Sequence, residues 1–184
     1  MKTLGFARRI ALAMALVATS AVGAFAQTTV ILVRHAEKAA EPAEDPPLTS
    51  AGEARARDLW LAVKDAGVSA VITTQYARTR ATAAPTATAT HLTPEIVRAG
   101  ETHVRDVADA VRKHVGHTVL VVGHSNTLPA IVEALGAVRP PPICDAEYDN
   151  LYVVTFSPDK RATLVRANFG VRTPVDSACA ATMR

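Results

Sequence analysis

The chain has 184 residues, of which 49% are apolar, and a formal net charge of +3. This length suits one domain with a sizeable core, and the apolar content excludes an intrinsically disordered protein. Lys2, Arg8 and Arg9 account for the whole charge excess, so the balanced remainder gives no support to nucleic-acid binding, which requires a basic surface.

The amino-terminal segment has the three parts of an export signal. Its positive residues precede the apolar run Ile10 to Val22, and Ala24-Phe25-Ala26 follows as a small-x-small cleavage pattern. We predict cleavage after Ala26, which makes residues 1–26 a signal peptide and residues 27–184 the mature domain. Retention as a membrane anchor is the alternative, although the run is short for a span of about 20 residues. After cleavage we expect a secreted or periplasmic protein without stable membrane insertion.

The mature sequence alternates between two hydrophobic patterns. Short β-branched apolar runs predict buried strands, and longer amphipathic stretches predict helices. This alternation favours a three-layer α/β sandwich with a mostly parallel central sheet, helices on both faces and an antiparallel hairpin at the edge. In chain order we expect a strand at 29–33, a helix from a capping box at 50–53 to about 65, a strand at 68–73, a helix at 78–91 with a kink or break at Pro85, a short strand at 95–98, a helix at 103–115, a strand at 118–122, a helix at 127–135, and a hairpin of 151–156 with 162–167.

Polar clusters directly follow three of the predicted parallel strands. They are Arg34-His35-Ala36-Glu37-Lys38, the run from Thr73 to Arg78, and Gly123-His124-Ser125-Asn126. Ligands of α/β sheets bind beyond the carboxyl ends of the strands, where these clusters would meet. Guanidinium groups bind phosphate oxygens in pairs, and histidines supply nucleophilic and proton-transfer chemistry near neutral pH. The clusters therefore predict a phosphate site.

These three motifs resemble the signatures of the histidine phosphatase superfamily, which has the phosphoglycerate-mutase-like fold. Arg34-His35-Ala36-Glu37 is similar to its R-H-G/A-E motif, the run from Thr74 to Ala83 to its second motif, and the run from Val122 to Asn126 to its third. The resemblance covers most of the mature chain and is closest to compact, exported members without a large inserted cap. Ala81 departs from the pattern, because Gln or Glu is frequent there.

The resemblance implies a phosphatase that forms a covalent phosphohistidine on His35. Arg34, Arg78 and His124 would surround the transferred phosphoryl group and stabilise its oxygens. It implies a metal-independent phosphoric monoester hydrolase of the histidine acid phosphatase type, with no metal and no cofactor. Because the attacking nitrogen must be unprotonated, we expect a neighbouring acceptor to hold the other N–H of His35.

The donor of the leaving-group proton has two candidates. Glu101 follows the short strand at 95–98, where this family often places its acid, and is our first choice; its alternative role is a surface residue at a helix start. Glu37 is the second choice, although it equally suits orienting His35 or pairing with Lys38.

Other polar residues near the motifs are assigned to substrate binding or to the surface. Glu37, Lys38, Thr74, Ser125 and Asn126 are the predicted substrate-binding residues, and the last two are alternatively helix caps. The acidic loop residues Glu41, Glu44 and Asp45 either disfavour highly anionic substrates or are simply solvated. His91, His103, His114 and His117 match no motif and are interpreted as surface or helix-end residues.

Three functions remain at this stage. The first is an exported phosphatase for a small phosphorylated substrate, either a phosphomonoester or a phosphohistidine. The second is a non-catalytic module of the same fold that binds phosphate, and the third is a phosphoglycerate-mutase-type phosphotransferase. Both histidines and both arginines are present, which favours catalysis. The natural substrate and the oligomeric state are not predicted.

Two cysteines in an exported domain predict a disulfide between Cys144 and Cys179. It would close a loop of about 36 residues and contribute about 3–4 kcal/mol of stability in the chain-entropy model. Mass spectrometry of non-reduced peptides from exported protein should show the two cysteines linked. Two free thiols, the alternative arrangement, would reject the pairing.

Overall fold

The computed structural model describes residues 27–157 and 160–174. The predicted signal peptide at 1–26 and the predicted disulfide partner Cys179 lie outside these residues. The described elements are β1 (Thr28–Arg34), α2 (Ser50–Val63), β2 (Val68–Thr73), α3 (Ala77–Ala89), β3 (Glu95–Ile96), α4 (His103–Arg112), β4 (Thr118–Gly123), α5 (Leu128–Ala134), β5 (Asn150–Ser157) and β6 (Lys160–Asn168).

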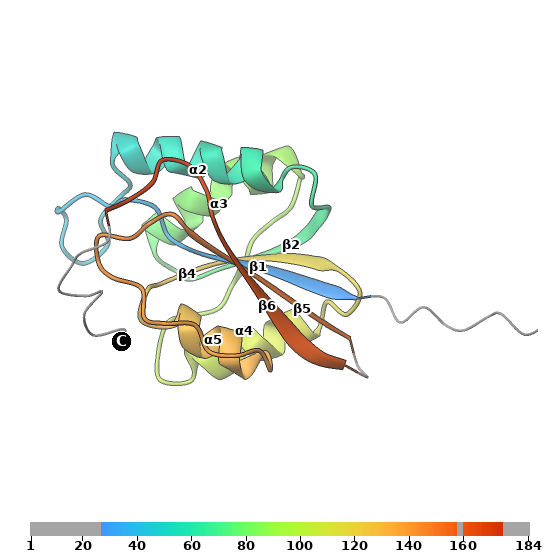
Figure 1. The fold of residues 1–184 in the computed structure, drawn as a ribbon. Helices are drawn as coiled ribbons and strands as arrows, with labels where there is room; N and C mark the ends of the chain where they lie inside the picture. The colour runs from blue at the N-terminus through green and yellow to red at the C-terminus, as the bar shows by residue number, and fades with distance from the viewer. Residues whose placement is uncertain (1–26, 158–159, 175–184) are drawn as a thin grey trace, which may run out of the picture.

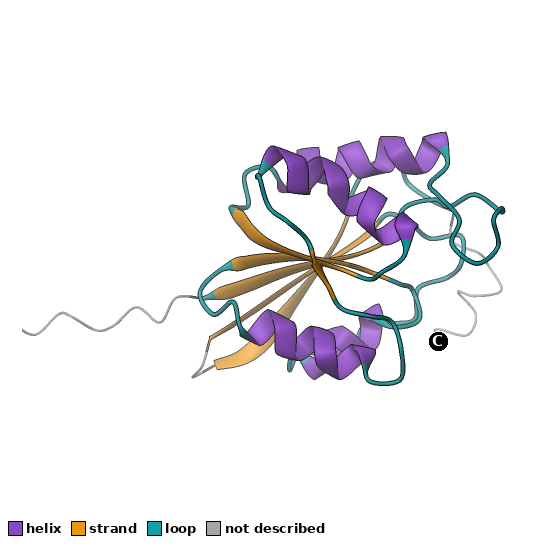
Figure 2. Cartoon of the chain, turned by 180° about the vertical axis from the view of Figure 1, so that it is seen from behind, coloured by secondary structure: helices purple, strands orange, loops and turns teal. Residues whose placement is uncertain are grey.

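The strands form one mixed sheet in the order β3-β2-β4-β1-β5-β6. Strands β3, β2, β4 and β1 run parallel, and β5 and β6 add the antiparallel hairpin at one side. Helices α2 and α3 cover one face and α4 and α5 the other (Figures 1 and 2). The predicted three-layer α/β sandwich is thus confirmed.

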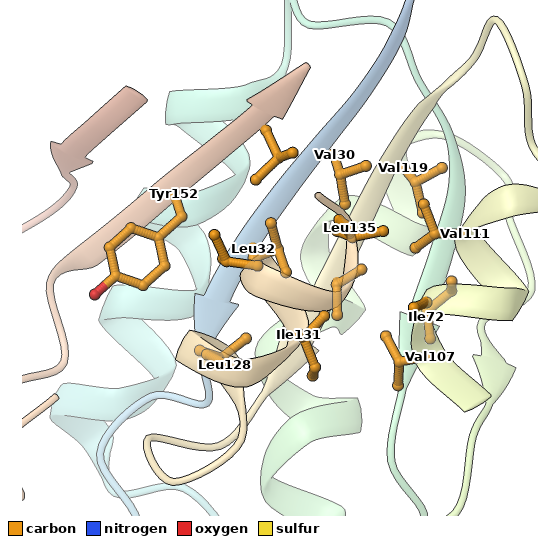
Figure 3. Close-up of a cluster of buried hydrophobic side chains, with 14 of the residues drawn as sticks. Val30, Leu32, Ile72, Val107, Val111, Val119, Leu128, Ile131, Leu135 and Tyr152 are labelled. Carbon is orange, nitrogen blue, oxygen red and sulfur yellow. The ribbon is translucent and has the colours of Figure 1, made fainter. Parts of the chain in front are cut away.

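Strand β1 shows why both faces of the sheet are covered. Successive side chains of a strand point to opposite faces. Val30 and Leu32 accordingly pack into one core cluster with the α4 and α5 side chains (Figure 3), whereas Ile31 and Val33 pack into a second cluster on the α2 side. A run of consecutive apolar residues therefore indicates a strand buried on both faces.

The register of the parallel strands aligns the ends that precede the three polar clusters. Val33 of β1 and Thr73 of β2 both pair with Val122 of β4, and Arg34 pairs with Gly123. The next residues along each strand therefore emerge side by side at one edge of the sheet. The backbone N–H of His35 extends this pairing by donating to the Gly123 carbonyl at 2.9 Å.

Three local predictions differ from the structure in detail. The cap of α2 is Thr49, one residue before the predicted one, because its hydroxyl accepts from the Gly52 N–H. Helix α3 continues through Pro85; burial of one whole face of α3 against the rest of the fold outweighs the cost of about 3 kcal/mol that an interior proline carries. Strand β3 covers two residues only, although the Val97 N–H still donates to the Thr73 carbonyl.

Among the described helices, none has the length and apolar content needed to cross a bilayer.

We predict that Gly52→Ala destabilises the protein by about 1–3 kcal/mol through overpacking. A Cβ at this position would fall far inside van der Waals contact of the Glu37 carbonyl oxygen, in the loop that follows His35. Helix propensity alone predicts the opposite sign, a gain of about 1 kcal/mol. Urea unfolding distinguishes the two, with Ser50→Ala on the exposed first turn as the control. A Gly52→Ala protein as stable as the parent would contradict this packing.

Candidate active site

His35 emerges from β1 with only one of its ring nitrogens engaged. Its side chain is 4% exposed, and Nδ1 lies 2.8 Å from the Ala36 carbonyl oxygen. A carbonyl only accepts, so Nδ1 carries the proton and Nε2 retains its lone pair when the ring is neutral. This is the acceptor that the sequence argument required. Ala36 is itself held, because its N–H donates to the Thr82 hydroxyl at 2.9 Å.

His124 follows β4 and is oriented by a chain of threonine hydroxyl groups. The Thr79 hydroxyl donates its one proton to a backbone carbonyl, that of Tyr76 at 2.9 Å. Thr74 is therefore the donor in its 2.9 Å contact with the Thr79 hydroxyl. The Thr74 oxygen is left to accept from His124 Nε2 at 3.1 Å. This order makes Nε2 the protonated nitrogen of neutral His124.

The two histidines face each other and are both neutral at pH 7. Their ring centroids lie 5.3 Å apart in an edge-to-face arrangement. Burial, followed by the charges of Arg34 and Arg78, lowers the pKa of His35 to about 4. Burial and the neighbouring His35 lower the pKa of His124 to about 3. A nucleophilic lone pair is therefore present over the whole neutral range.

Arg78, at the start of α3, is positioned by Tyr76 and Asp45. Its guanidinium carbon lies 4.2 Å from the centroid of the Tyr76 ring, and Nη1 lies 3.7 Å from an Asp45 oxygen. Asp45 also accepts from the Ala77 N–H at 2.8 Å, which satisfies the first turn of α3. Of the three acidic residues in the loop, Asp45 is thus a structural partner of the site, whereas Glu41 and Glu44 are exposed.

Arg34 is held by the loop that follows α5. Its Nη1 atom lies 2.9 Å from each of three carbonyl oxygens, those of Cys144, Asp145 and Glu147. The guanidinium carbon also lies 4.2 Å from the Tyr148 ring centroid. Arg34 therefore fixes this loop beside the site, and its Nε atom is left without a partner.

An open cavity of about 350 Å³ collects His35, Arg78 and His124. Ser125 and Asn126 also line it, as their assignment to substrate binding requires, whereas Arg34 is not among its lining residues. Three buried side-chain nitrogens lack a hydrogen-bond partner in the described chain. They are Nε of Arg34, Nε of Arg78 and Nε2 of His103. Arg78 and His103 line the cavity, where a bound ligand would satisfy such atoms.

Glu37 does not take the roles predicted for it. Both of its carboxylate oxygens accept from the Arg55 guanidinium, at 2.8 to 3.0 Å. Arg55 is 4% exposed and also donates to the Phe169 carbonyl. The carboxylate is therefore committed to a structural ion pair on α2, which argues against Glu37 as substrate ligand or proton donor. Lys38, the neighbouring candidate, is exposed and absent from the cavity lining.

His103 corrects the prediction for the unassigned histidines. It is 3% exposed and lines the cavity, rather than lying at the surface. The signal was present in the sequence, because His103 precedes Val107 and Val111 at helical spacing on the buried stripe of α4. Glu101, by contrast, is exposed, and the cavity is lined by Gly100 and His103 on either side of it. His91 and His117 are exposed and His114 is half-buried.

Within residues 27–157 and 160–174, no three His, Cys, Asp or Glu side chains are grouped so that they could hold a metal ion.

Comparisons with known proteins give one matching family model and one shared fold. The model of the histidine phosphatase superfamily (branch 1) matches residues 30–100, and no curated protein sequence matches the chain. The protein histidine phosphatase SixA in complex with tungstate is 20% identical, with a TM-score of 0.58 over 76% of this chain and 96% of that one. A mycobacterial glucosyl-3-phosphoglycerate phosphatase is 13% identical, with a TM-score of 0.61 over 78% of this chain and 100% of that one. A phosphoglycerate mutase from Bacillus anthracis is 15% identical, with a TM-score of 0.58 over 84% of this chain and 96% of that one. At these identities the structures establish a shared fold.

The lowered pKa of His35 predicts acid sensitivity of the folded protein. In the unfolded chain this group takes up a proton below about pH 6.5, whereas in the fold it does so only near pH 4. The unfolded state therefore binds more protons, and the free energy of unfolding falls as the pH drops between these values. We expect His35→Asn to remove about 2–3 kcal/mol of this loss. Urea unfolding across the window measures it, with exposed His117→Asn as the control. Equal pH slopes in parent and His35→Asn would contradict the prediction.

Proposed function

We propose that the chain is a phosphatase of the histidine phosphatase superfamily, whose model matches residues 30–100, and that it hydrolyses a phosphomonoester or a phosphohistidine through a phosphoenzyme on His35. The observation that carries this proposal is the state of His35. Its Nδ1 atom is committed to the Ala36 carbonyl, and its low pKa keeps the ring neutral at pH 7. The remaining lone pair, on Nε2, belongs to a residue that lines the cavity.

The proposed reaction has two steps. In the first, Nε2 of His35 forms a bond to phosphorus while the bond from phosphorus to the leaving atom breaks. That atom is the oxygen of a phosphomonoester or the ring nitrogen of a phosphohistidine, and it takes up a proton. In the second, a water oxygen bonds to phosphorus, the phosphorus–nitrogen bond breaks, and the water gives up a proton. Inorganic phosphate is released, and the neutral imidazole of His35 is regenerated.

Arg78 is the group proposed to stabilise the charge on the transferred phosphoryl oxygens, and His124 would join it once Nδ1 is protonated, because the proton of its neutral ring is donated to Thr74. Phosphoryl transfer depends mainly on positioning and charge stabilisation, and Arg78 is held by its stack on Tyr76 and its contact with Asp45. The unpartnered Nε atom of Arg78, a residue that lines the cavity, would complete its hydrogen bonding on the phosphoryl group. Removal of one such donor typically costs about 3–4 kcal/mol of barrier stabilisation.

The two alternative functions differ in what happens to the phosphoryl group. A non-catalytic phosphate-binding module would bind inorganic phosphate without forming a phosphoenzyme. A mutase would return the phosphoryl group to a second hydroxyl of the substrate rather than to water. We favour hydrolysis because the site borders an open cavity, which admits water to the phosphohistidine.

Export is a further part of the proposal. It rests on residues 1–26, which lie outside the described residues. The substrate would then be a phosphorylated compound or a phosphorylated side chain met outside the cytoplasm. A mature amino terminus at Gln27, found by mass spectrometry of protein recovered from the secreting cell, would support this part.

The nucleophile is tested with 4-nitrophenyl phosphate and no added metal. We expect the mature protein to release phosphate in the presence of a chelator and to form an acid-labile phosphoenzyme. His35→Asn should reduce kcat by at least about a thousandfold, as loss of a nucleophile does in other enzymes, and abolish the phosphoenzyme. His114→Asn, just beyond the end of α4 and beside Glu95, is the matched control. Hydrolysis that survives in His35→Asn would refute the nucleophile, and phosphate binding without turnover would favour the binding module.

A further inference from the structure

His103 is a buried cavity residue that the two-step reaction above does not use. It opens α4, its side chain is 3% exposed, and it lines the cavity together with His35 and His124. Its Nε2 atom is buried and has no hydrogen-bond partner among the residues that the structure describes. A polar atom left in this state costs free energy unless a ligand satisfies it. The position of His103 therefore points to a contact with the bound substrate.

Only one nitrogen of His103 is available for proton transfer. The Nδ1 atom lies 3.0 Å from the Arg98 carbonyl oxygen. Because a carbonyl only accepts, Nδ1 is protonated in both the neutral and the charged ring. Every proton that His103 gains or loses is therefore carried by Nε2, the unpartnered atom of a ring that belongs to a cavity-lining residue. This hydrogen bond also fixes the direction of the ring.

We propose that His103 is the catalytic acid and base of this phosphatase, an inference that rests on the proposed function. In the first step, protonated Nε2 gives its proton to the leaving oxygen as the bond from that oxygen to phosphorus breaks. His103 is then neutral. In the second step, Nε2 takes a proton from the water that attacks the phosphohistidine, which restores the charged ring. Protons balance over the cycle, and no further reactant is needed.

Glu101, the acid expected from the sequence, is less well placed for this role. Its side chain is exposed, and it is absent from the cavity lining although Gly100 and His103 both contribute to it. The segment from Ala99 to His103 thus turns His103 inward and Glu101 outward. The proposal keeps the segment that the resemblance suggested for the acid and moves the role to a different residue within it.

Several charged or titratable groups act on His103. Asp106 lies one turn further along α4 and interacts with it electrostatically. His124, which follows β4, also interacts with His103 electrostatically. Arg78 of α3 lines the same cavity. A dianionic phosphate bound there would carry the charge opposite to that of the protonated His103 ring, which the first step requires.

The test compares two substrates that differ in their need for a proton. The 4-nitrophenolate of 4-nitrophenyl phosphate departs without protonation, whereas the more basic phenolate of phenyl phosphate requires it. His103→Asn retains a side-chain N–H that can bond the Arg98 carbonyl but lacks Nε2. We expect it to lower kcat/KM for phenyl phosphate about a hundredfold or more, the usual range for general acid catalysis, and to change kcat/KM for 4-nitrophenyl phosphate little.

Two controls separate this role from a structural one. Glu101→Gln and His114→Asn should leave the ratio of the two kcat/KM values unchanged. Equal losses for both substrates in His103→Asn would overturn the inference, because a structural residue affects both alike. A selective loss in Glu101→Gln would assign the acid to Glu101 and would overturn it too, even if His103→Asn failed to fold.

The inference and the proposed function fail in different ways. A phosphoenzyme on His35 in the wild-type protein, together with no selective loss in His103→Asn, refutes the inference alone. Activity that survives in His35→Asn, or a wild-type protein that hydrolyses neither substrate, refutes the proposed function and with it the inference.

Discussion

The hydrogen bond from His35 Nδ1 to the Ala36 carbonyl is the interaction on which the account of the site depends. It selects the tautomer whose lone pair lies on Nε2, and burial beside two arginines keeps the ring neutral. With the opposite tautomer, the proton would occupy the attacking nitrogen and the same cluster of side chains would only bind anions. The carbonyl is in turn held in place, since Thr82 accepts from the Ala36 N–H and donates to the Arg78 carbonyl at 2.7 Å.

The fold brings the other site residues beside His35 by aligning the ends of three strands. Parallel pairing of β1, β4 and β2 in one register brings His35, His124 and Thr74 to one edge of the sheet. Helix α3 then adds Arg78, and α4 adds His103. Each arginine of the site also stacks on a tyrosine, Arg34 on Tyr148 and Arg78 on Tyr76. Planar stacking and fixed carbonyls limit the freedom of long side chains, so little conformational entropy is left to lose when a phosphate binds.

Hydrophobic runs made most of this fold predictable from sequence, and the motifs that follow those runs made part of the site predictable. Uninterrupted β-branched runs such as Thr118 to Val122 indicate strands buried on both faces, and the motifs around His35 and His124 occur directly after such strands. Partners brought together by tertiary structure were not predictable. The commitment of Glu37 to Arg55 depends on how α2 packs beside the first motif. The burial of His103 could be predicted from its place on the apolar stripe of α4, whereas the Arg98 carbonyl that fixes its ring could not.

The tautomer and charge of His35 can be observed directly in the free protein. A long-range ¹H–¹⁵N correlation spectrum of the ¹⁵N-labelled chain distinguishes a protonated ring nitrogen from one with a lone pair. At about pH 6, well above the pKa of about 4, the account predicts a neutral His35 with the proton on Nδ1 and an unprotonated Nε2. A proton on Nε2, or a charged ring at that pH, would contradict the central claim.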